Sequence, residues 1–347
     1  MTKTHRIGII GCGWAGDRHA NALAALKSRA ELCAVTDVDS DIAQGCAKRY
    51  NVSHWTTDYQ EVLSPEILDA VVIALPHHLH AAVTIEAVEA GLHVLVEKPL
   101  ATSLSEADAM IAAAEQAGVQ LMVAENVRYD NTYIKAAERV RSGALGRLYL
   151  VRISREHHMH DYLHRRPWFL KDEAAGIMFS GGIHDFELLR LLAGEIEHVY
   201  GLTAPKSLSD MVADDTSVVV AELEGGASAI LVESFSLRTP HPGVHGTVHG
   251  SDGSLWFHND RIRLYTAAED GQSEMIEEIN VPARDTFEAE MTHFLDCIKG
   301  DNEPITSGRE ERKPLVAVLA TYESIRRGER VYLADFETHA ANTPSAS

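Results

Sequence analysis

The first functional motif along the chain consists of three glycines, Gly11, Gly13 and Gly16. They have the spacing G-x-G-x-x-G directly after the apolar run 7–10. Gly11 allows a tight turn, Gly13 lets the backbone approach a pyrophosphate, and Gly16 lets the next helix pack on the strand. The helix N-terminus then presents unpaired N–H groups and a positive dipole to the phosphates. The spacing therefore predicts a dinucleotide-binding turn.

An acidic residue, Asp37, ends the next apolar run, twenty-one residues after Gly16. A carboxylate at this place accepts hydrogen bonds from the adenosine ribose hydroxyls and repels a 2′-phosphate. The sequence thus predicts NAD as the cofactor in preference to NADP. The residues expected to bind it here are Gly11, Cys12, Gly13, Trp14, Ala15 and Asp37.

The elements that must position these residues alternate between short apolar runs and alanine-rich helical segments. This alternation is typical of a doubly wound parallel sheet, so we predict an N-terminal Rossmann domain over residues 1–125 in an α/β fold. The expected strands are 6–10, 31–36, 70–74, 93–96 and 120–124. The expected helices are 15–28, 39–50, 80–90 and 105–117, the last opened by a capping box of Ser103 and Glu106.

From Asn126 onward the pattern becomes one of alternating strands joined by glycine-rich and acidic turns. It predicts a substrate-binding and oligomerisation domain over 126–336 with a mainly antiparallel sheet, then a disordered tail over 337–347. We expect ligands to bind in the cleft between the two domains. The expected strands are 148–155, 199–202, 217–222, 227–234, 244–249, 254–258, 261–265 and 331–333. The expected helices are 132–142, 183–192, 286–299 and 310–326.

Composition narrows the class of protein. The 347 residues are 45% hydrophobic and 24% charged, and the formal net charge of −20 argues against nucleic acid or an anionic membrane as a partner. The four cysteines have no C-x-x-C spacing, which favours reduced thiols. No apolar stretch reaches the ~18 residues of a membrane span. We therefore expect a cytoplasmic protein.

Several stretches of the chain match one known family. They are 11–16 with His19, 74–80, 90–101 with the segment Glu97-Lys98-Pro99, 126–129, 181–185 and 320–324. Over nearly its whole length the chain resembles the Gfo/Idh/MocA family, which includes glucose-fructose oxidoreductase and inositol dehydrogenases. The resemblance implies a Rossmann domain, a second α/β domain with a large open, mainly antiparallel sheet, and NAD(P)-dependent oxidation or reduction of sugars, sugar derivatives or cyclitols.

The resemblance also implies a catalytic pair. Lys98 would lie beside the nicotinamide, where its ammonium group donates a hydrogen bond to the substrate oxygen and eases removal of the hydroxyl proton. His184 would accept that proton as hydride leaves the substrate carbon. The alternatives are a solvated loop lysine and a structural histidine at the start of an apolar helix.

The chain departs from the family pattern at Ser180. Many relatives have an aspartate four residues before the histidine, and a serine holds no negative charge. Asp185 could substitute in part, or the Ser180 hydroxyl could relay a proton, and the spacing does not decide between them. Leu75 and His77 also replace a threonine and an asparagine that are common in relatives. The resemblance places near the cofactor Leu75, Pro76, His77, His80, Glu97, Lys98, Asn126 and Trp168.

Candidate substrate contacts lie at three further places. Arg128 and Tyr129 follow the fifth strand, at the edge of a parallel sheet where ligands gather. His157 and His158 lie in a histidine-rich run that reads as substrate contacts, a surface loop or a zinc site; no cysteine accompanies them, and we predict no metal. Trp168 either shields the hydride path or packs at the domain junction.

These residues leave three functions open. The leading one is an NAD-dependent dehydrogenase or reductase of a sugar, sugar derivative or cyclitol, with Lys98 and His184 on the hydroxyl. The second is a glycosidase that oxidises its substrate transiently with NAD and eliminates the glycosidic group. The third is a non-catalytic NAD-binding sensor or regulatory protein. In this fold the outer sheet face often meets a neighbouring subunit, so a homodimer or homotetramer is expected.

Overall fold

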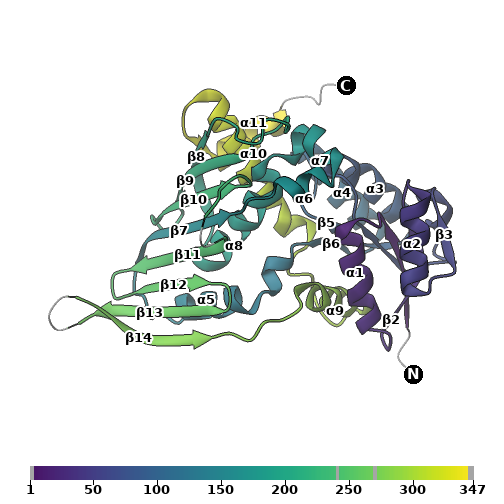
Figure 1. The fold of residues 1–347 in the computed structure, drawn as a ribbon, viewed down its shortest axis with the longest axis horizontal. Coiled ribbons are helices and arrows are strands. Elements are labelled where there is room, and N and C mark those ends of the chain that lie inside the picture. The colour runs from purple at the N-terminus through teal and green to yellow at the C-terminus, as the bar shows by residue number, and fades with distance from the viewer. Residues whose placement is uncertain (1–3, 240–241, 269–271, 343–347) are drawn as a thin grey trace. The chain divides into compact units, whose positions relative to one another are not determined.

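The computed structural model describes residues 4–239, 242–268 and 272–342. The chain forms two compact units, coloured along the sequence in Figure 1. Unit 1 comprises Met1–Asn126 and Asp285–Arg312, and unit 2 comprises Val127–Arg284 and Lys313–Ser347. The first segment of unit 1 ends at Asn126. The return of 285–312 to unit 1 differs from the predicted boundaries, in which this segment is part of the second domain.

The returning segment joins unit 1 through both backbone and side chains. Helix α9 (Thr286–Lys299) packs against α1 (Trp14–Ala25), with the rings of Phe287 and Trp14 edge to face at 5.8 Å. After α9, the Val123 amide donates to the Thr306 carbonyl at 2.8 Å. These contacts are remote in sequence, which is why local patterns do not reveal them.

Unit 1 is built on a six-stranded parallel sheet in the order β3-β2-β1-β4-β5-β6. The predicted strands are confirmed; β3, only three residues long, is additional. The strands are β1 (His5–Ile10), β2 (Ala30–Thr36), β3 (His54–Thr56), β4 (Ala70–Ile73), β5 (His93–Glu97) and β6 (Leu121–Ala124). The other helices are α2 (Ser40–Tyr50), α3 (His80–Glu89) and α4 (Leu104–Ala117). The order places the carboxyl ends of β1, β4 and β5 side by side.

The predicted capping box opens α4 with a shift of one residue. The Ser103 hydroxyl accepts a hydrogen bond from the Glu106 amide at 3.2 Å, as expected for an N-cap. The Glu106 carboxylate reaches back to the amide and hydroxyl of Thr102, at 3.0 and 2.8 Å. The helix start is therefore fixed from both sides.

Unit 2 is built on a nine-stranded mixed sheet in the order β14-β13-β12-β11-β7-β10-β9-β8-β15. Among the strands of this sheet that the structure describes, only β7 and β10 pair in parallel. The strands are β7 (Leu148–Glu156), β8 (Ile196–Thr203), β9 (Thr216–Leu223), β10 (Ser228–Ser234), β11 (Gly243–Gly250), β12 (Ser254–His258), β13 (Arg261–Ala267), β14 (Ser273–Asn280) and β15 (Val331–Tyr332). Strand β14 was not predicted, because its acidic, exposed sequence lacks apolar alternation.

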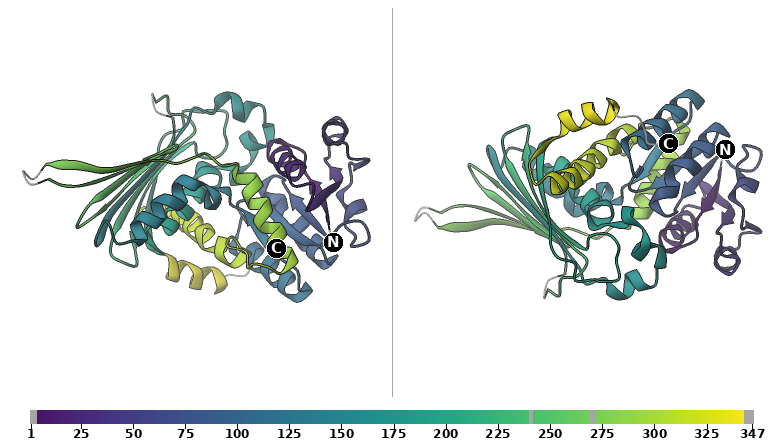
Figure 2. Two further views of the ribbon diagram at one scale, coloured as in Figure 1. Left: turned by 90° about the horizontal axis from the view of Figure 1, so that it is seen from below. Right: turned by 90° about the horizontal axis from the view of Figure 1, so that it is seen from above.

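The larger helices of unit 2 gather on one face of this sheet (Figure 2). They are α5 (Asn131–Arg141), α8 (Ile183–Ala193), α10 (Gly308–Arg327, which begins in unit 1) and α11 (Leu333–Asn342); the shorter α6 (His160–His164) and α7 (Pro167–Lys171) follow β7. Residues 337–342 belong to α11, so the predicted tail overlaps a helix there, and residues 343–347 lie outside the described part. The strands below the helices alternate buried and half-exposed residues, as an amphipathic sheet does.

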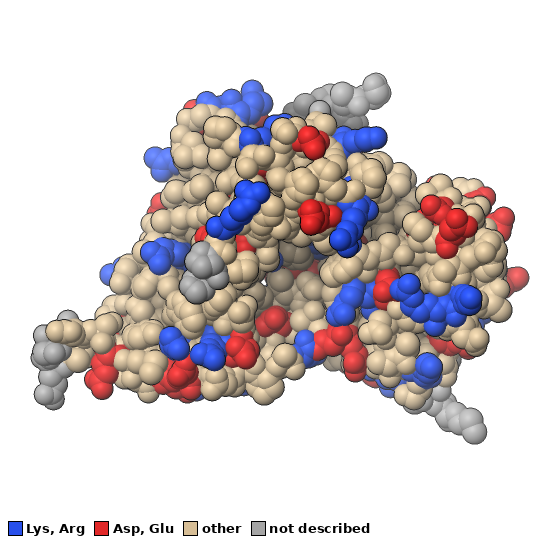
Figure 3. Space-filling view, in the orientation of Figure 1, with Lys and Arg blue, Asp and Glu red and all other residues tan. Residues whose placement is uncertain are grey.

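Charged side chains of both signs are interspersed on the surface face drawn in Figure 3. Within the described residues, none of the helices combines the length and apolarity required to cross a bilayer.

Candidate functional site

The glycine turn of unit 1 has the geometry that a bound pyrophosphate requires. Gly11 has φ of 92°, and a Cβ there would lie 2.2 Å from the Ala74 carbonyl oxygen. A Cβ on Gly16 would lie 2.0 Å from the Gly11 oxygen. At Gly13, by contrast, no heavy atom of the described residues lies within 4 Å of an added Cβ. The turn is therefore closed on the protein side and open at Gly13, where α1 begins without a side-chain cap among the described residues.

The Asp37 carboxylate is held in place at the end of β2. Its Oδ2 accepts a hydrogen bond from the Cys12 amide at 2.9 Å, and its Oδ1 accepts one from the Asp39 amide at 3.0 Å. The carboxylate is thus tied to the glycine turn itself and remains half-buried. These residues fit the ribose and phosphate groups of a dinucleotide.

Lys98 follows β5 and is half-buried, and its peptide bond to Pro99 is cis. The loop around it is fastened by His80, which is fully buried: Nδ1 lies 2.8 Å from the Pro99 carbonyl oxygen and Nε2 lies 2.9 Å from the Leu75 carbonyl oxygen. Burial lowers the pKa of His80, although the two carbonyls oppose that shift. One imidazole therefore joins the loops after β4 and β5.

Glu97 is fixed by a second buried histidine. The Nε2 of His19 lies 3.0 Å from the Glu97 carboxylate, and the His19 ring packs edge to face on Phe287. Burial alone would raise the pKa of Glu97, but the hydrogen bond with His19 and the charge of Lys98 hold it below its ordinary value. Glu97 therefore stays ionised next to Lys98. This contact gives His19, which the sequence analysis lists without a role, a structural function.

The other cofactor candidates of unit 1 are placed as follows. His77 is 6% exposed and packs edge to face on His80. The Asn126 side-chain amide donates to the Thr286 hydroxyl at 3.2 Å, which engages it with α9. Sequence reasoning missed Glu290 on α9, a fully buried carboxyl whose pKa is raised well above its ordinary value by burial and by the nearby charges of Glu97 and Glu125.

His184 lies in unit 2, on the first turn of α8, directly after a π-helical turn over Met178–Gly182. It is half-buried. The Ser180 hydroxyl in the π turn donates to the Ala175 carbonyl at 3.1 Å. Asp185 is fully buried, and its Oδ1 accepts a hydrogen bond from the Arg155 guanidinium at 2.5 Å. Both candidate helpers of His184 are thus engaged by other groups.

A further buried carboxyl lies close to this turn and was not predicted. Glu233 on β10 pairs in register with Arg155 on β7, and the Arg155 Nε lies 3.9 Å from the Glu233 Oε2. Glu233 follows the buried Ala229 and Leu231 at alternating positions of the same strand. The sequence signal for Glu233 is an acidic residue at one of the alternating strand positions that are otherwise apolar and face the core.

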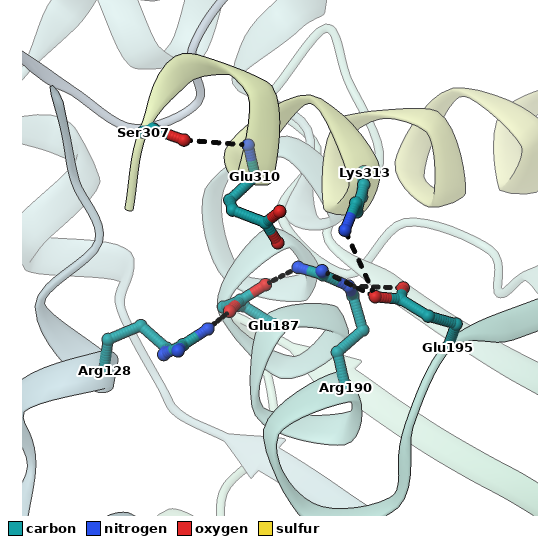
Figure 4. A network of polar contacts seen from close by, with 7 residues as sticks. All are labelled: Arg128, Glu187, Arg190, Glu195, Ser307, Glu310 and Lys313. Atoms are coloured by element: carbon teal, nitrogen blue, oxygen red, sulfur yellow. Dashed lines mark hydrogen bonds and ion pairs between the residues drawn. The ribbon is translucent and has the colours of Figure 1, made fainter. Parts of the chain in front are cut away.

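Arg128 is bound within a chain of ion pairs in unit 2 (Figure 4). Its guanidinium pairs with the buried Glu187 on α8, which also pairs with Arg190. Arg190 in turn binds Glu195 through two hydrogen bonds of 2.8 and 2.9 Å. The neighbouring substrate candidate, Tyr129, is 4% exposed, so Arg128 is the more accessible of the two.

The histidine-rich run after β7 is dispersed over several partners. The backbone of His158 bridges to Ser236, the rings of His160 and His164 stack at 4.0 Å, and His164 faces Asp210 at 3.1 Å. Burial lowers the pKa of His157. The described residues hold no group of three or more potential ligands arranged to bind a metal ion. The half-buried Trp168 packs on Phe169 at a ring distance of 4.8 Å.

Two segments of the chain match models of one protein family. Residues 5–125 match the family described as "Oxidoreductase family, NAD-binding Rossmann fold", and residues 133–256 match the "GFO/IDH/MocA C-terminal domain". The chain is 29% identical to D-apiose dehydrogenase of Paraburkholderia graminis over 99% of its own length and 94% of that protein. It is 32% identical to inositol 2-dehydrogenase 2 of Saccharopolyspora erythraea, covering 74% of each chain.

A solved structure extends the likeness to the fold. The WlbA dehydrogenase from Bordetella pertussis, in complex with NADH and UDP-GlcNAcA, superposes with a TM-score of 0.83 at 27% identity, covering 95% of this chain and 99% of that one.

Proposed function

Because the chain belongs to the Gfo/Idh/MocA family of NAD(P)-dependent dehydrogenases that act on CH–OH groups, we propose that it transfers hydride between NAD and a hydroxyl or keto carbon of a sugar, sugar derivative or cyclitol. The observation that carries this proposal is that His80 fastens the loop that holds Lys98, next to the ionised Glu97 at the carboxyl end of β5. Ligands of open parallel sheets bind at that edge. The substrate class follows from what the relatives' names say they oxidise.

Each residue has a defined task in this proposal. NAD⁺, when bound, supplies the acceptor for hydride. The Lys98 ammonium group donates a hydrogen bond to the substrate oxygen and stabilises the negative charge that develops there. His184, whose ring is neutral as a base, takes the hydroxyl proton and returns it in the reverse reaction. Trp168, Arg128 and the histidines 157 and 158 are proposed to contact the substrate.

Asp37 supports NAD over NADP as the cofactor. Two backbone amides hold its carboxylate in one orientation next to the glycine turn, so this negative charge would repel a 2′-phosphate. We expect Asp37→Ala to reduce the preference for NAD, measured as the ratio of kcat/KM with NAD and NADP. An unchanged ratio would contradict this role.

The test is formation of NADH with a panel of aldoses, sugar acids, polyols, inositols and glycosides, using the full chain. We expect turnover with at least one free sugar or cyclitol, lost in Lys98→Ala and His184→Ala but kept in the exposed-lysine control Lys48→Ala. Release of aglycone without accumulation of NADH would instead favour the glycosidase. Tight NAD binding with no turnover on any substrate would favour the sensor.

We also propose that the protein is a homodimer or homotetramer that associates through the outer face of the nine-stranded sheet. Three strands of that sheet carry exposed apolar side chains: Tyr149 on β7, Leu202 on β8 and Val220 on β9. Light scattering of the wild type and of Val220→Glu checks this. A charge buried in an apolar interface should dissociate the oligomer and so lower the measured molar mass. A wild-type monomer would overturn it.

A further inference from the structure

Three charged side chains form a buried cluster beneath the turn that carries His184. Arg155 and Glu233 are register partners on the parallel strands β7 and β10, and Asp185 comes from α8. The Arg155 guanidinium donates to Asp185 at 2.5 Å and lies 3.9 Å from Glu233. Both acids are fully buried and Arg155 is 14% exposed. The cluster therefore holds two carboxyls and one guanidinium away from water.

The charges of this cluster balance only if one carboxyl keeps its proton. Arg155 remains protonated in any case. Burial and the neighbouring Asp185 carboxyl raise the pKa of Glu233 well above its ordinary value, against the influence of Arg155. Both oxygens of Glu233 and the Oδ2 of Asp185 lack a hydrogen-bond partner among the described residues. A proton held between the two acids would balance the charge and give a hydrogen-bond partner to one oxygen of each acid.

The cluster also touches the backbone of the turn. A Cβ on Gly181 would lie 3.1 Å from the Glu233 Oε2 and 3.2 Å from the Arg155 Cδ, so these side chains press directly against the π turn. Gly181 lies three residues before His184, and Asp185 comes immediately after it. The cluster therefore supports the backbone on both sides of His184.

We propose that Asp185 and Glu233 together carry one negative charge, which pairs with the Arg155 cation. This shared carboxylate positions the turn of His184. It also supplies the fixed negative charge that Ser180 lacks. The proposal rests on the proposed role of His184 as the base. Asp185 and Glu233 act through His184 and are positioning residues. When one acid is neutralised, the other takes over as the carboxylate that pairs with Arg155.

Other titratable groups of the described residues also act on this cluster. Tyr133 from α5 acts on Arg155, and His157 from the end of β7 is influenced by Arg155 and by Asp185. His157 is half-buried, and burial lowers its pKa.

The experiment measures the apparent pKa of His184 from the pH dependence of its carbethoxylation by diethyl pyrocarbonate, followed by peptide mapping of the full chain. Asp185→Asn and Glu233→Gln should each change this pKa by much less than one unit, because one carboxylate remains. The double variant should lower it by about one unit or more, because Arg155 then stands alone. Glu222→Gln, at a half-exposed carboxyl on β9, is the control and should leave the pKa of His184 unchanged.

An infrared measurement tests the same proposal without the double variant. The wild type minus Asp185→Asn difference spectrum at neutral pH should show loss of a protonated carboxyl with no net loss of carboxylate, because Glu233 ionises in the variant. Retention of the protonated carboxyl, or an Asp185→Asn variant that shifts His184 as far as the double one, would overturn the proposal. Neither readout needs substrate, so a chain without dehydrogenase activity would refute the proposed function and leave this result standing.

Discussion

The two candidate catalytic residues are held in different ways. Lys98 lies in a short segment that the sequence comparison with the family already identified. Its loop is held by His80, which bonds to two backbone carbonyls, and by His19, which bonds to Glu97. His184 follows a π turn that is supported by charges from two strands and a helix, none of which the sequence match singled out except Asp185. The first arrangement depends on hydrogen bonds from histidines to backbone carbonyls and to an ionised carboxylate, and the second on the protonation of buried acids.

This difference shows which substitutions each region tolerates. In unit 1 the loop geometry is fixed by close packing and by carbonyl hydrogen bonds, so removing a group there changes shape. In unit 2 the geometry depends on a balance of charge, so exchanging an acid for its amide changes titration more than shape.

The largest effect is expected at Lys98. Lys98→Ala removes the donor to the substrate oxygen and should lower kcat by about 10² to 10⁴. NAD affinity should change little, because the glycine turn and Asp37 are untouched. Steady-state kinetics and a fluorescence titration with NAD measure the two quantities on the same preparation. A drop in affinity as large as the drop in kcat would mean that Lys98 organises the loop and does no chemistry.

The next effect is expected at the glycine turn. Gly16→Ala places a methyl group 2.0 Å from the Gly11 oxygen, so the turn must open and NAD affinity should fall more than tenfold along with thermal stability. Gly13→Ala is the matched variant, because its Cβ meets no described atom within 4 Å. It should keep the melting temperature and still weaken NAD binding if a phosphate occupies that space. Equal melting temperatures for both variants would contradict the packing argument.

The sequence predicts unit 1 better than unit 2 for a physical reason. Glycine spacing, Asp37 and the strand before Lys98 are local signals, and the parallel order of the sheet brings them to one edge. The acids at 185 and 233 meet Arg155 only through the parallel pairing of β7 and β10, which no local pattern specifies. The return of α9 to unit 1 and the exposed strand β14 escaped prediction for related reasons, since one depends on remote contacts and the other lacks an apolar face.

A third prediction restores the residue that relatives carry. Ser180→Asp places a carboxylate four residues before His184, on the same side of the helical turn. A negative charge there favours the imidazolium form and raises the pKa of His184. Because the base must be neutral, the acid limb of kcat for oxidation should move to higher pH by up to about one unit. Ser180→Asn, of similar size without charge, should leave the limb in place, and a shift in both variants would point to shape alone.

The smallest effect is a contrast in the pH dependence of stability between Glu233 and Glu97. The pKa of Glu233 is raised from an ordinary value of 4.5, so the folded state keeps a proton that the unfolded state releases, and its contribution to stability falls as the pH rises above that value. Glu233→Gln removes this loss. The variant should gain on the wild type as the pH rises above 4.5, by up to about 1.4 kcal/mol per pH unit.

Glu97 has the opposite sign, because its pKa lies below 4.5 in the folded state. Its contribution is complete above that pH and is lost as the pH falls further, so Glu97→Gln should cost stability at neutral pH and less in acid. Urea denaturation of both variants and the wild type at several pH values measures the two slopes. Parallel slopes would show that the two regions do not differ in how charge holds them, since a buried acid that stays protonated and one that stays ionised cannot respond to pH in the same direction.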